Sequence, residues 1–411
     1  MDSSYPMTDK QDILLARQPI YDANKNISGF ELLFRDSLPN SDTSTFDGNR
    51  ATSRVLLSLF TESDLTTVTD GLPAFINFTA ELIHTPPLFD PKSIIIEVLE
   101  DIEITDEIIS SLKKLKQKGF TLALDDFVMD AKYHPILDFV DIVKLELPEM
   151  NNETLKQTIS TLKQYKVKLL AEKIETPEQF KLCKDLGCDL FQGYFLSKPE
   201  IIKGKKIAAG KMAVINLISE IQSPTIDMDG LTQIITKDPA LSFKLLKLIN
   251  SAAFKRSKTI DSIHKAVTLL GIDKIKSWAS LLALSKLDDK PEYLHYIALV
   301  RALMCERLSE YFQGQSKELF YTVGLLSCLD AFFDQDIKQV VGYIDLDASI
   351  NQALLSYQGP AGLALKTTIY FEQARWHKLN WEKLGELELN AKLVNEIYFE
   401  STRLALELQD H

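Results

Sequence analysis

Short apolar segments with a recurring polar residue constrain the fold of the first half of this chain more than any other feature. The segments are ILLARQPIY, GFELLFR, AFINFT, SIIIEVLE, TLALDDF, DIVKLEL, VKLLAEKI and DLFQGYFL. Such β-branched and leucine-rich runs predict strands, and helix-like stretches such as 106–118 and 176–186 lie between them. Gly119 and Gly187 follow those two stretches, as glycines that end helices do. The alternation predicts a mostly parallel sheet, with enough repeats to close a (β/α)₈ barrel.

The polar side chains of seven of these segments form a second pattern. They are Glu31, Asn77, Glu97, the pair Asp125-Asp126, Lys144, Glu172 and Gln192. A lone Glu31 or Glu97 at a strand end is more often a solvated or salt-bridged carboxylate, whereas the Asp125-Asp126 pair inside an apolar strand is harder to explain in that way. An apolar strand has no structural use for a polar end, however, and seven in succession indicate ligands that converge. In a (β/α)₈ barrel the carboxyl ends of the strands meet at one face, which carries the active site.

Five of these side chains offer only oxygen ligands, which hard divalent cations such as Mg²⁺ and Mn²⁺ prefer. These candidate metal ligands are Glu31, Asn77, Glu97, Asp125 and Asp126. Adjacent aspartates would each face a different ion, and two ions about 4 Å apart form a known arrangement for phosphodiester hydrolysis. Lys144 would hold the attacking water or a phosphate oxygen, and Glu172 would accept a proton.

The periodicity of the sequence changes near Met212, where apolar residues begin to recur at three- and four-residue spacing. This spacing predicts an all-helical second half, with helices at 231–235, 241–249, 263–270, 297–308 and 393–406. Breakers such as Asp238-Pro239, Gly271 and Gly359-Pro360 separate them. We therefore expect a flexible tail at 1–11, a barrel domain at 12–202, a linker at 203–211 and a helical domain at 212–411.

The composition limits the partners and the compartment. The chain has 46 Lys and Arg against 58 Asp and Glu, a formal charge of −12, which disfavours a long nucleic acid but not a small anion in a local pocket. The four cysteines show no disulfide framework, so we expect free thiols, with zinc binding by Cys183 and Cys188 as the alternative. The N-terminus lacks a secretory pattern, and no apolar run approaches the roughly 20 residues that span a bilayer. We expect a soluble, cytoplasmic protein that does not enter a membrane.

The strand-end residues resemble, in order, the motifs of the EAL domain. The matching segments are Gln18-Pro19-Ile20, Glu31-Leu32-Leu33-Phe34-Arg35, Ile76-Asn77, Ile96-Glu97, Asp125-Asp126-Phe127, Val143-Lys144, Ala171-Glu172 and Gln192-Gly193-Tyr194. The resemblance implies a modified TIM barrel that opens cyclic di-GMP to linear pGpG with two Mg²⁺ or Mn²⁺ ions. By the same resemblance the five oxygen ligands bind metal, and Lys144 and Glu172 handle the attacking water. Arg35 and Gln192 would contact the nucleotide, and Glu100 would support the loop after Asp126.

Three positions depart from the usual EAL pattern. Active members usually continue Asp-Asp-Phe with Gly-Thr-Gly, whereas this chain reads Phe127-Val128-Met129-Asp130 and lacks both turn glycines. Lys173 replaces the glycine that usually follows the Ala-Glu pair. We expect its ammonium near the metal site, where it would repel a cation or bind phosphate. The usual Lys-x-Asp ends in Glu146, a milder change. The candidate ligands are all present, and we expect the loop that follows them to take a different path.

The second half resembles the HDOD domain. The matching segments are Lys237-Asp238-Pro239-Ala240-Leu241, Asn250-Ser251-Ala252, residues 266–271, Arg301-Ala302, Cys305-Glu306 and residues 324–327. This all-helical output module is related to HD phosphohydrolases but lacks their His-Asp pair, and none of the six histidines here precedes an aspartate. EAL followed by HDOD resembles a bacterial signalling architecture, the YuxH-like class, for which the altered loop is typical. We expect Asn250-Ser251 to cap or turn the chain rather than to contact a ligand.

Two functions remain open at this point. The first is a cyclic di-GMP signalling regulator, whose barrel binds the nucleotide with weak hydrolysis or none. Its HDOD half would pass the signal to an unidentified protein partner, or to a second copy in a homodimer. The alternative is an active metal-dependent phosphodiesterase that produces pGpG. An unrelated metalloenzyme of the enolase type fits the carboxylates and the lysine but not the helical half.

Overall fold

The computed structural model describes residues 13–36, 65–86, 90–194, 207, 209–250, 260–287 and 290–409 of the chain. The expected tail at 1–11 and most of the expected linker at 203–211 lie outside these residues. Among the helices that the structure describes, none is both long and apolar enough to cross a membrane.

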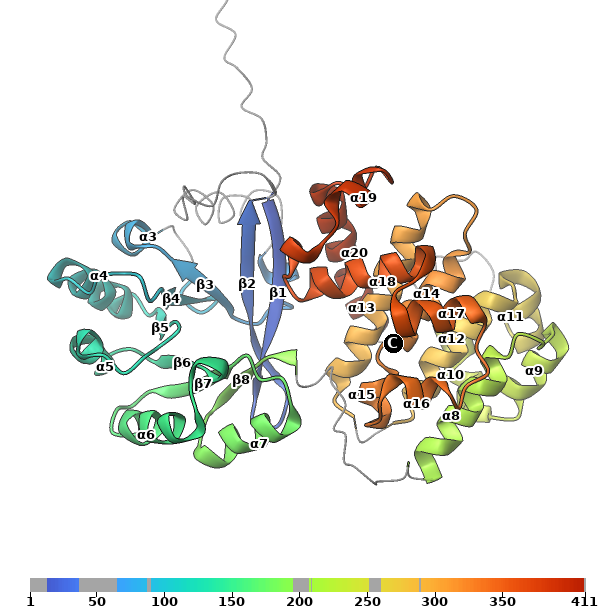
Figure 1. Ribbon diagram of the computed structural model, residues 1–411, viewed down its shortest axis with the longest axis horizontal. Helices are drawn as coiled ribbons and strands as arrows, with labels where there is room; N and C mark the ends of the chain where they lie inside the picture. Colours follow the sequence, from blue (N-terminus) through green and yellow to red (C-terminus); the bar gives the residue numbers. More distant parts are fainter. Residues whose placement is uncertain are drawn as a thin grey trace, which may run out of the picture. The chain divides into compact units, whose positions relative to one another are not determined.

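Eight strands close into a barrel in sequence order, as the sequence predicts (Figure 1). Strands β2 to β6 are hydrogen-bonded as parallel neighbours. The strands are β1 (Ile13–Asp22), β2 (Ile27–Asp36), β3 (Ala74–Phe78), β4 (Ile94–Val98), β5 (Thr121–Leu124), β6 (Ile142–Glu146), β7 (Lys168–Glu172) and β8 (Leu190–Gln192).

The connection from β1 to β2 distinguishes this barrel from eight repeated β/α units. It has only four residues, and it closes through hydrogen bonds from Lys25 N to Asp22 O and from Asp22 N to Asn26 O. A parallel neighbour requires a crossover of a dozen residues or more. We infer that β1 runs antiparallel to β2, which makes this a modified (β/α)₈ barrel.

The crossovers between the later strands contain helices that lie around the strands in Figure 1. Helix α4 is amphipathic, and it begins where Thr105 accepts a hydrogen bond from the Ile108 amide. Gly119, with φ of 94°, follows it. Helix α7 begins at a capping box and ends at Gly187, which has φ of 95°, so both expected glycine ends are confirmed. The helices of this half are α2 (Leu65–Val68), α3 (Ala80–His84), α4 (Asp106–Gln117), α5 (His134–Leu137), α6 (Asn152–Leu162) and α7 (Pro177–Leu186), with 3₁₀ turns η2 (Ala131–Tyr133) and η3 (Leu147–Glu149).

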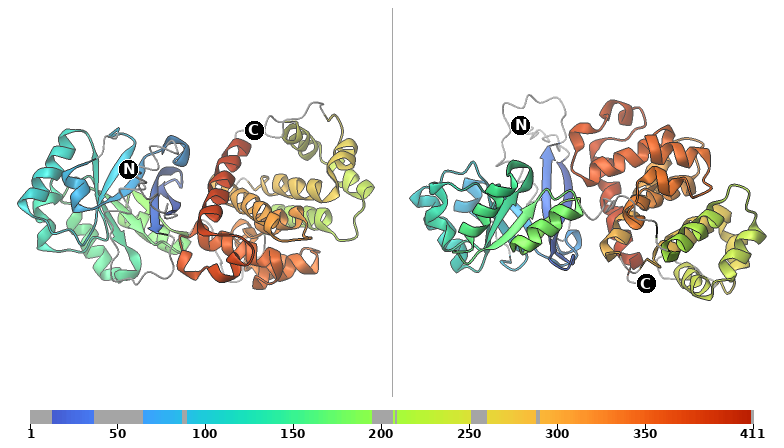
Figure 2. Two further views of the ribbon diagram at one scale, coloured as in Figure 1. Left: turned by 90° about the horizontal axis from the view of Figure 1, so that it is seen from above. Right: turned by 60° about the horizontal axis from the view of Figure 1, so that its bottom comes forward.

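The described residues from 209 onward form helices and no strand, which confirms the all-helical second half (Figure 2). Helix α13 is buried along most of its length and packs against α14 and α18, so it lies at the core of this half. The helices are α8 (Ala209–Gln222), α9 (Met228–Thr236), α10 (Pro239–Ile249), α11 (Ile263–Leu270), α12 (Ile272–Leu284), α13 (Glu292–Leu308), α14 (Lys317–Leu326), α15 (Leu329–Phe333), α16 (Ile337–Val341), α17 (Ala348–Ser356), α18 (Gly359–Glu372), α19 (Trp381–Gly385) and α20 (Ala391–Gln409), with 3₁₀ turns η6 (Ser309–Tyr311) and η7 (Trp376–Lys378).

Asn250 ends helix α10 in the capping role expected for it. Its side-chain Nδ2 donates to the carbonyls of Leu246 and Ile260, each at 2.8 Å. Its Oδ1 accepts from the Ile260 amide, also at 2.8 Å. The amide therefore joins the end of α10 to the residue where the described chain resumes. Its partner in the sequence motif, Ser251, lies outside the described residues.

Candidate metal and nucleotide site

The register of the sheet brings the first three candidate ligands to one end of the barrel. Asn77 on β3 lies opposite Glu97 on β4, and Glu31 on β2 lies opposite Phe75, two residues before Asn77. Residues that are paired across strands, or two apart along one strand, share a face of the sheet. Glu31 and Glu97 are 7% and 0% exposed, as expected for side chains that point into the barrel. The structure therefore places Glu31, Asn77 and Glu97 together.

The paired aspartates follow β5 directly, and a change in the backbone makes both useful. Successive side chains of a regular strand point to opposite faces, so two adjacent aspartates would ordinarily diverge. Asp125 continues the strand, with its amide donating to Val98 O at 3.0 Å. Asp126 has φ of 38°, in the left-handed region that non-glycine residues rarely adopt. This turn brings both carboxylates to the same side.

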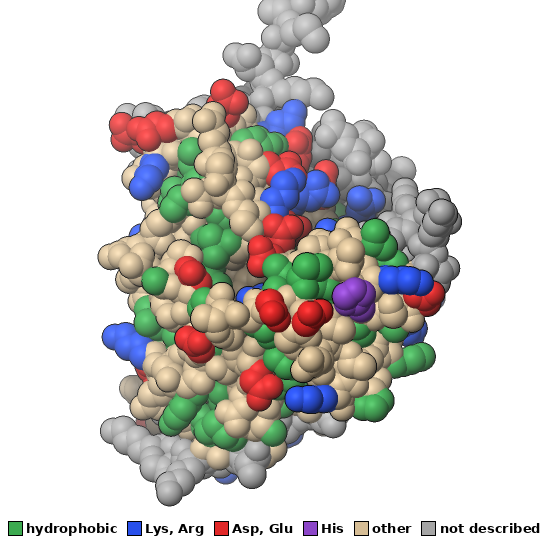
Figure 3. Space-filling view, turned by 90° about the vertical axis from the view of Figure 1, so that its right-hand side faces the viewer, with side chains coloured by type: hydrophobic (Ala, Val, Ile, Leu, Met, Phe, Trp, Pro, Cys, Tyr) green, Lys and Arg blue, Asp and Glu red, His purple; other side chains and the backbone are tan. Residues whose placement is uncertain are grey.

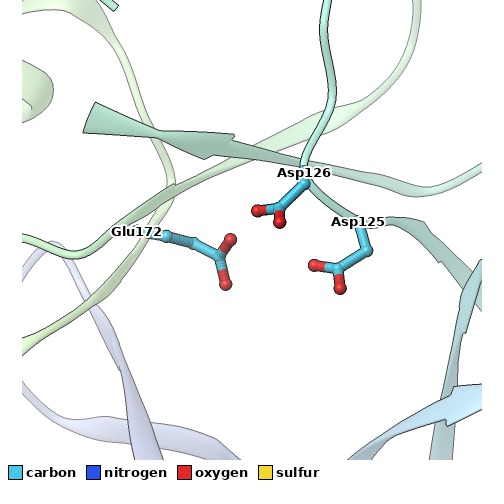
Figure 4. A group of neighbouring side chains, drawn as sticks. All are labelled: Asp125, Asp126 and Glu172. Carbon is cyan, nitrogen blue, oxygen red and sulfur yellow. The ribbon is translucent and has the colours of Figure 1, made fainter. Parts of the chain in front are cut away.

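Glu172, the last residue of β7, completes a carboxylate cluster with this pair. One oxygen from each of Asp125, Asp126 and Glu172 lies within 4.8 Å of the other two. Figure 4 shows the two aspartates side by side and the Glu172 carboxylate directed toward them. In the described part of the chain, these three carboxylates lie close enough together to bind one metal ion.

Lys144 on β6 lies among the other carboxylates. Its Nζ is 2.5 Å from Glu97 Oε1, 2.7 Å from Asp125 Oδ1 and 3.3 Å from Glu31 Oε1. The lysine is 1% exposed. Sequence reasoning assigned this lysine to water or phosphate and did not anticipate these ion pairs, because the pairing depends on which strands become neighbours.

The buried oxygens of this site fit a hard cation. Among the residues that the structure describes, Asn77 Oδ1 and Glu97 Oε2 are buried without a hydrogen-bond donor. Burial raises the pKa of Glu97 well above its usual value; the Lys144 charge opposes this effect, and the charges of Glu31 and Asp125 add to it. Buried acceptors without donors are costly, and oxygen atoms of this kind are the ligands that Mg²⁺ and Mn²⁺ prefer.

The loop after Asp126 is organised by side chains rather than by turn glycines. Phe127 is buried, its amide donates to Lys144 O at 3.1 Å, and its ring packs on Tyr133. Asp130 caps the following 3₁₀ turn by accepting from the Lys132 amide at 2.9 Å. Lys132 Nζ in turn donates to the carbonyl of Glu100 at 2.9 Å. Residue 100 thus contacts this loop through its main chain, and Lys132 is a supporting residue that sequence reasoning missed.

The segment after β7 contains the unexpected lysine. Lys173 has φ of 54° and an exposed side chain. The left-handed backbone explains why glycine suits this position. Nearby, Gly193 has φ of 145°, and a Cβ there would lie 2.1 Å from Ile174 O. The close approach of these two segments requires a glycine at 193, which the Gln-Gly-Tyr motif signals in the sequence.

Gln192 and Arg35 are the two candidate ligands for the nucleotide. Gln192 is the last residue of β8 and is 3% exposed. Arg35 lies in β2, but its side chain is outside the described part of the structure. All four cysteines are buried free thiols.

The helical half contains a separate buried ion pair. Arg301 in α13 is 4% exposed, and its Nε and Nη2 donate to the two carboxylate oxygens of Glu372 in α18 at 2.7 and 2.8 Å. Arg301 Nη1 also lies 3.4 Å from Cys328 Sγ. This bidentate pair joins two core helices.

Two family models match the chain. The EAL domain matches residues 62–199, and the HDOD domain matches residues 211–337. The matched ranges fall on the barrel and on the helical half, respectively.

Two relatives are similar to nearly the whole chain. YuxH of Bacillus subtilis (strain 168) is 31% identical over 415 residues, covering 97% of this chain and 99% of that protein. The cyclic di-GMP phosphodiesterase CdgJ of Vibrio cholerae serotype O1 is 32% identical over 400 residues, covering 96% of this chain and 92% of that protein.

Solved structures of EAL proteins are more distant. An EAL domain protein from Listeria monocytogenes is 21% identical, covering 47% of this chain and 93% of that one, with a TM-score of 0.34. BlrP1 of Klebsiella pneumoniae in complex with manganese and cyclic di-GMP is 22% identical, covering 46% of this chain and 57% of that one, with a TM-score of 0.36. From the family matches and the full-length relatives we conclude that this chain belongs to the family of EAL–HDOD proteins that includes YuxH and CdgJ.

Proposed function

We propose that this chain is a cyclic di-GMP signalling regulator whose barrel binds the nucleotide together with divalent metal ions. The observation that carries the proposal is the convergence of Asp125, Asp126 and Glu172 within 4.8 Å at the carboxyl ends of two barrel strands. Cyclic di-GMP is the compound on which the relative CdgJ acts, according to its name, and the compound bound in the BlrP1 complex.

The charge of the site supports a pair of divalent cations. Glu31, Glu97, Asp125, Asp126 and Glu172 contribute five carboxylates, and Lys144 contributes one ammonium. When all are ionised, five negative charges and one positive charge leave −4, which two Mg²⁺ or Mn²⁺ ions would neutralise. Asn77 would add a neutral oxygen ligand, so that the metal ligands would be Glu31, Asn77, Glu97, Asp125 and Asp126.

The nucleotide would be held beside these ions by Arg35 and Gln192. A guanidinium matches a phosphate through two parallel hydrogen bonds, which suits Arg35 to the anionic part of cyclic di-GMP. Gln192, at the carboxyl end of β8, offers an amide at the same face of the barrel. The loop after Asp126 would be supported at residue 100, through the contact that Lys132 makes with the Glu100 carbonyl.

Hydrolysis to pGpG is the second candidate, and the position of Glu172 favours it. The Glu172 carboxylate is 6% exposed and faces the aspartate pair, where it would accept a proton from the attacking water. Lys144 would hold the water or a phosphate oxygen. Cations bound at the cluster would polarise the phosphodiester and stabilise the charge that develops on its oxygens.

Binding is tested by calorimetry with cyclic di-GMP in Mg²⁺, Mn²⁺ or Ca²⁺. We expect heat of binding that depends on the cation. Asp126→Asn should weaken binding, whereas Asp185→Asn, the same change in helix α7 away from the cluster, should not. A well-folded protein that shows no heat with any of the three cations would refute the proposed function.

Hydrolysis is tested separately, by chromatography after long incubation at high protein concentration. We expect Glu172→Gln to abolish any pGpG formation and to leave nucleotide binding largely intact. Glu178→Gln, on the surface of α7, is the matched control. If the wild-type protein binds cyclic di-GMP but forms no pGpG, the regulator stands and the phosphodiesterase does not.

We propose that the helical half passes the state of the barrel to a protein partner or to a second copy of the chain. Its exposed hydrophobic side chains support this role, above all Phe243 on α10 and Leu269 on α11, which are 69% and 65% exposed. Figure 3 shows hydrophobic side chains in small groups between acidic and basic ones on one face of the molecule. Light scattering separates the two cases, because a second copy would double the measured mass.

A further inference from the structure

The position of Lys144 carries an inference about how the metal ions would enter the site. Its ammonium contacts Glu31, Glu97 and Asp125, three of the five proposed metal ligands. These three ion pairs hold one ammonium between three carboxylates. The lysine therefore fills the space between these ligands as an internal cation.

An ammonium and a divalent cation would compete for the same oxygens. Two positive charges about 4 Å apart repel strongly in a partly buried site. The contacts of 2.5 Å to Glu97 and 2.7 Å to Asp125 leave those two oxygens engaged with Lys144. A metal ion that binds these same two oxygens must displace the ammonium from at least one of them, and an ion at Glu97 Oε2 would lie close enough to the ammonium to repel it.

We propose that Lys144 is an exchangeable counter-ion, which holds the carboxylate cluster in the metal-free protein and withdraws from Glu97 and Asp125 when a divalent cation binds. This inference rests on the proposed function. It gives the barrel a folded metal-free state, because the buried carboxylates are never left without a positive charge. It also links the two roles of the lysine, since the ammonium becomes available to water or to a phosphate oxygen only after the metal has taken its place.

The test is the affinity of Mn²⁺ alone, measured by calorimetry and by the electron paramagnetic resonance signal of free Mn²⁺. Lys144→Met keeps most of the side-chain volume and removes the charge. Lys168→Met removes the same charge from the exposed first residue of β7 and is the matched control. We expect Lys144→Met to bind Mn²⁺ tighter by on the order of tenfold or more. Its melting temperature without metal should fall below that of the wild type and recover with Mn²⁺. The control should change neither property.

Two outcomes separate the exchange from the proposed function, and the folding of Lys144→Met decides which variant is measured. Equal or weaker Mn²⁺ binding by Lys144→Met, beside a wild type that binds Mn²⁺, would overturn the exchange and leave the metal site standing. A wild type that does not bind Mn²⁺ would remove the metal site and with it the proposed function. If Lys144→Met folds only with Mn²⁺, the exchange is supported; if it folds in neither condition, Lys144→Gln, which retains a polar group, is measured in the same way and decides by the same affinities.

Discussion

The buried carboxyl group of Asp330 in α15 leads to a quantitative prediction about the helical half. Burial is the main cause that raises its pKa from 3.8 to about 6; the Ala331 amide, which donates to it at 2.8 Å, and the charge of Arg301 oppose the shift. The charge of Asp336 raises it slightly further. A shift of about two pKa units corresponds to about 3 kcal/mol between the two protonation states.

Because its pKa is raised in the folded protein, Asp330 makes the free energy of unfolding larger at low pH than at neutral pH. The folded protein holds this proton more tightly than the unfolded chain does, so the group favours the folded state most below about pH 4. That contribution is lost as the pH rises toward about 6, and above pH 6 the buried charge lowers stability by a constant amount. Asp330→Asn removes the charge and keeps an oxygen for the Ala331 amide. We expect it to raise the free energy of unfolding at pH 7.5 by up to about 3 kcal/mol, less the lost attraction to Arg301.

The assay is urea unfolding followed by tryptophan fluorescence. Trp278 lies in α12 and is buried, so its part of the fluorescence signal reports on the helical half. The advantage of Asp330→Asn should shrink by about 1.4 kcal/mol between pH 7.5 and pH 5, because the wild-type carboxyl becomes protonated there. Asp229→Asn, at an exposed position of α9, is the control. A gain that is absent, or that does not change with pH, would refute the dominance of burial at Asp330.

Three further substitutions test the described backbone. Gly193→Ala should destabilise the barrel by about 2 kcal/mol or more, because its Cβ would meet Ile174 O at 2.1 Å. Thermal unfolding followed by circular dichroism measures this loss, and an unchanged transition temperature would contradict the prediction. Lys173→Gly should stabilise the barrel by roughly 1 kcal/mol by relieving a φ of 54°, measured by urea unfolding; a loss of stability would show that the lysine side chain matters more than the backbone. Asn250→Ala should cost the helical half about 1–3 kcal/mol through three lost hydrogen bonds, and tryptophan fluorescence should report it; no loss would argue against the capping role.

The sequence is informative about the strands because their signal is local. Apolar runs of strand length, separated by helical periods that end at Gly119 and Gly187, carry their own propensities and turn chemistry. Polar residues that interrupt such runs stand out against that pattern, so the candidate ligands can be recognised from the order of residues alone. The change to three- and four-residue spacing near Met212 indicates the helical half in the same way.

The path of the chain between these elements is harder to predict from the sequence. Residues 127–133 lack turn glycines, and the sequence indicates only that the loop takes a different path. Its actual form depends on Phe127 packing on Tyr133 and on Lys132 reaching the Glu100 carbonyl, a contact across 32 positions of sequence. One part of this loop does have a local signal, since an aspartate such as Asp130 commonly caps the turn that follows it.

Side-chain chemistry and short-range spacing are enough to predict which elements form and which strand-end residues offer oxygen atoms to a metal ion. How those oxygen atoms come together depends on contacts between distant parts of the chain. The left-handed turn at Asp126 aims two adjacent carboxylates at one space, and strand register sets Asn77 beside Glu97. Barrel closure brings Glu172 to the aspartates and encloses Lys144 among three carboxylates. These contacts join strands that are distant in sequence, and their geometry exists only once the barrel is complete.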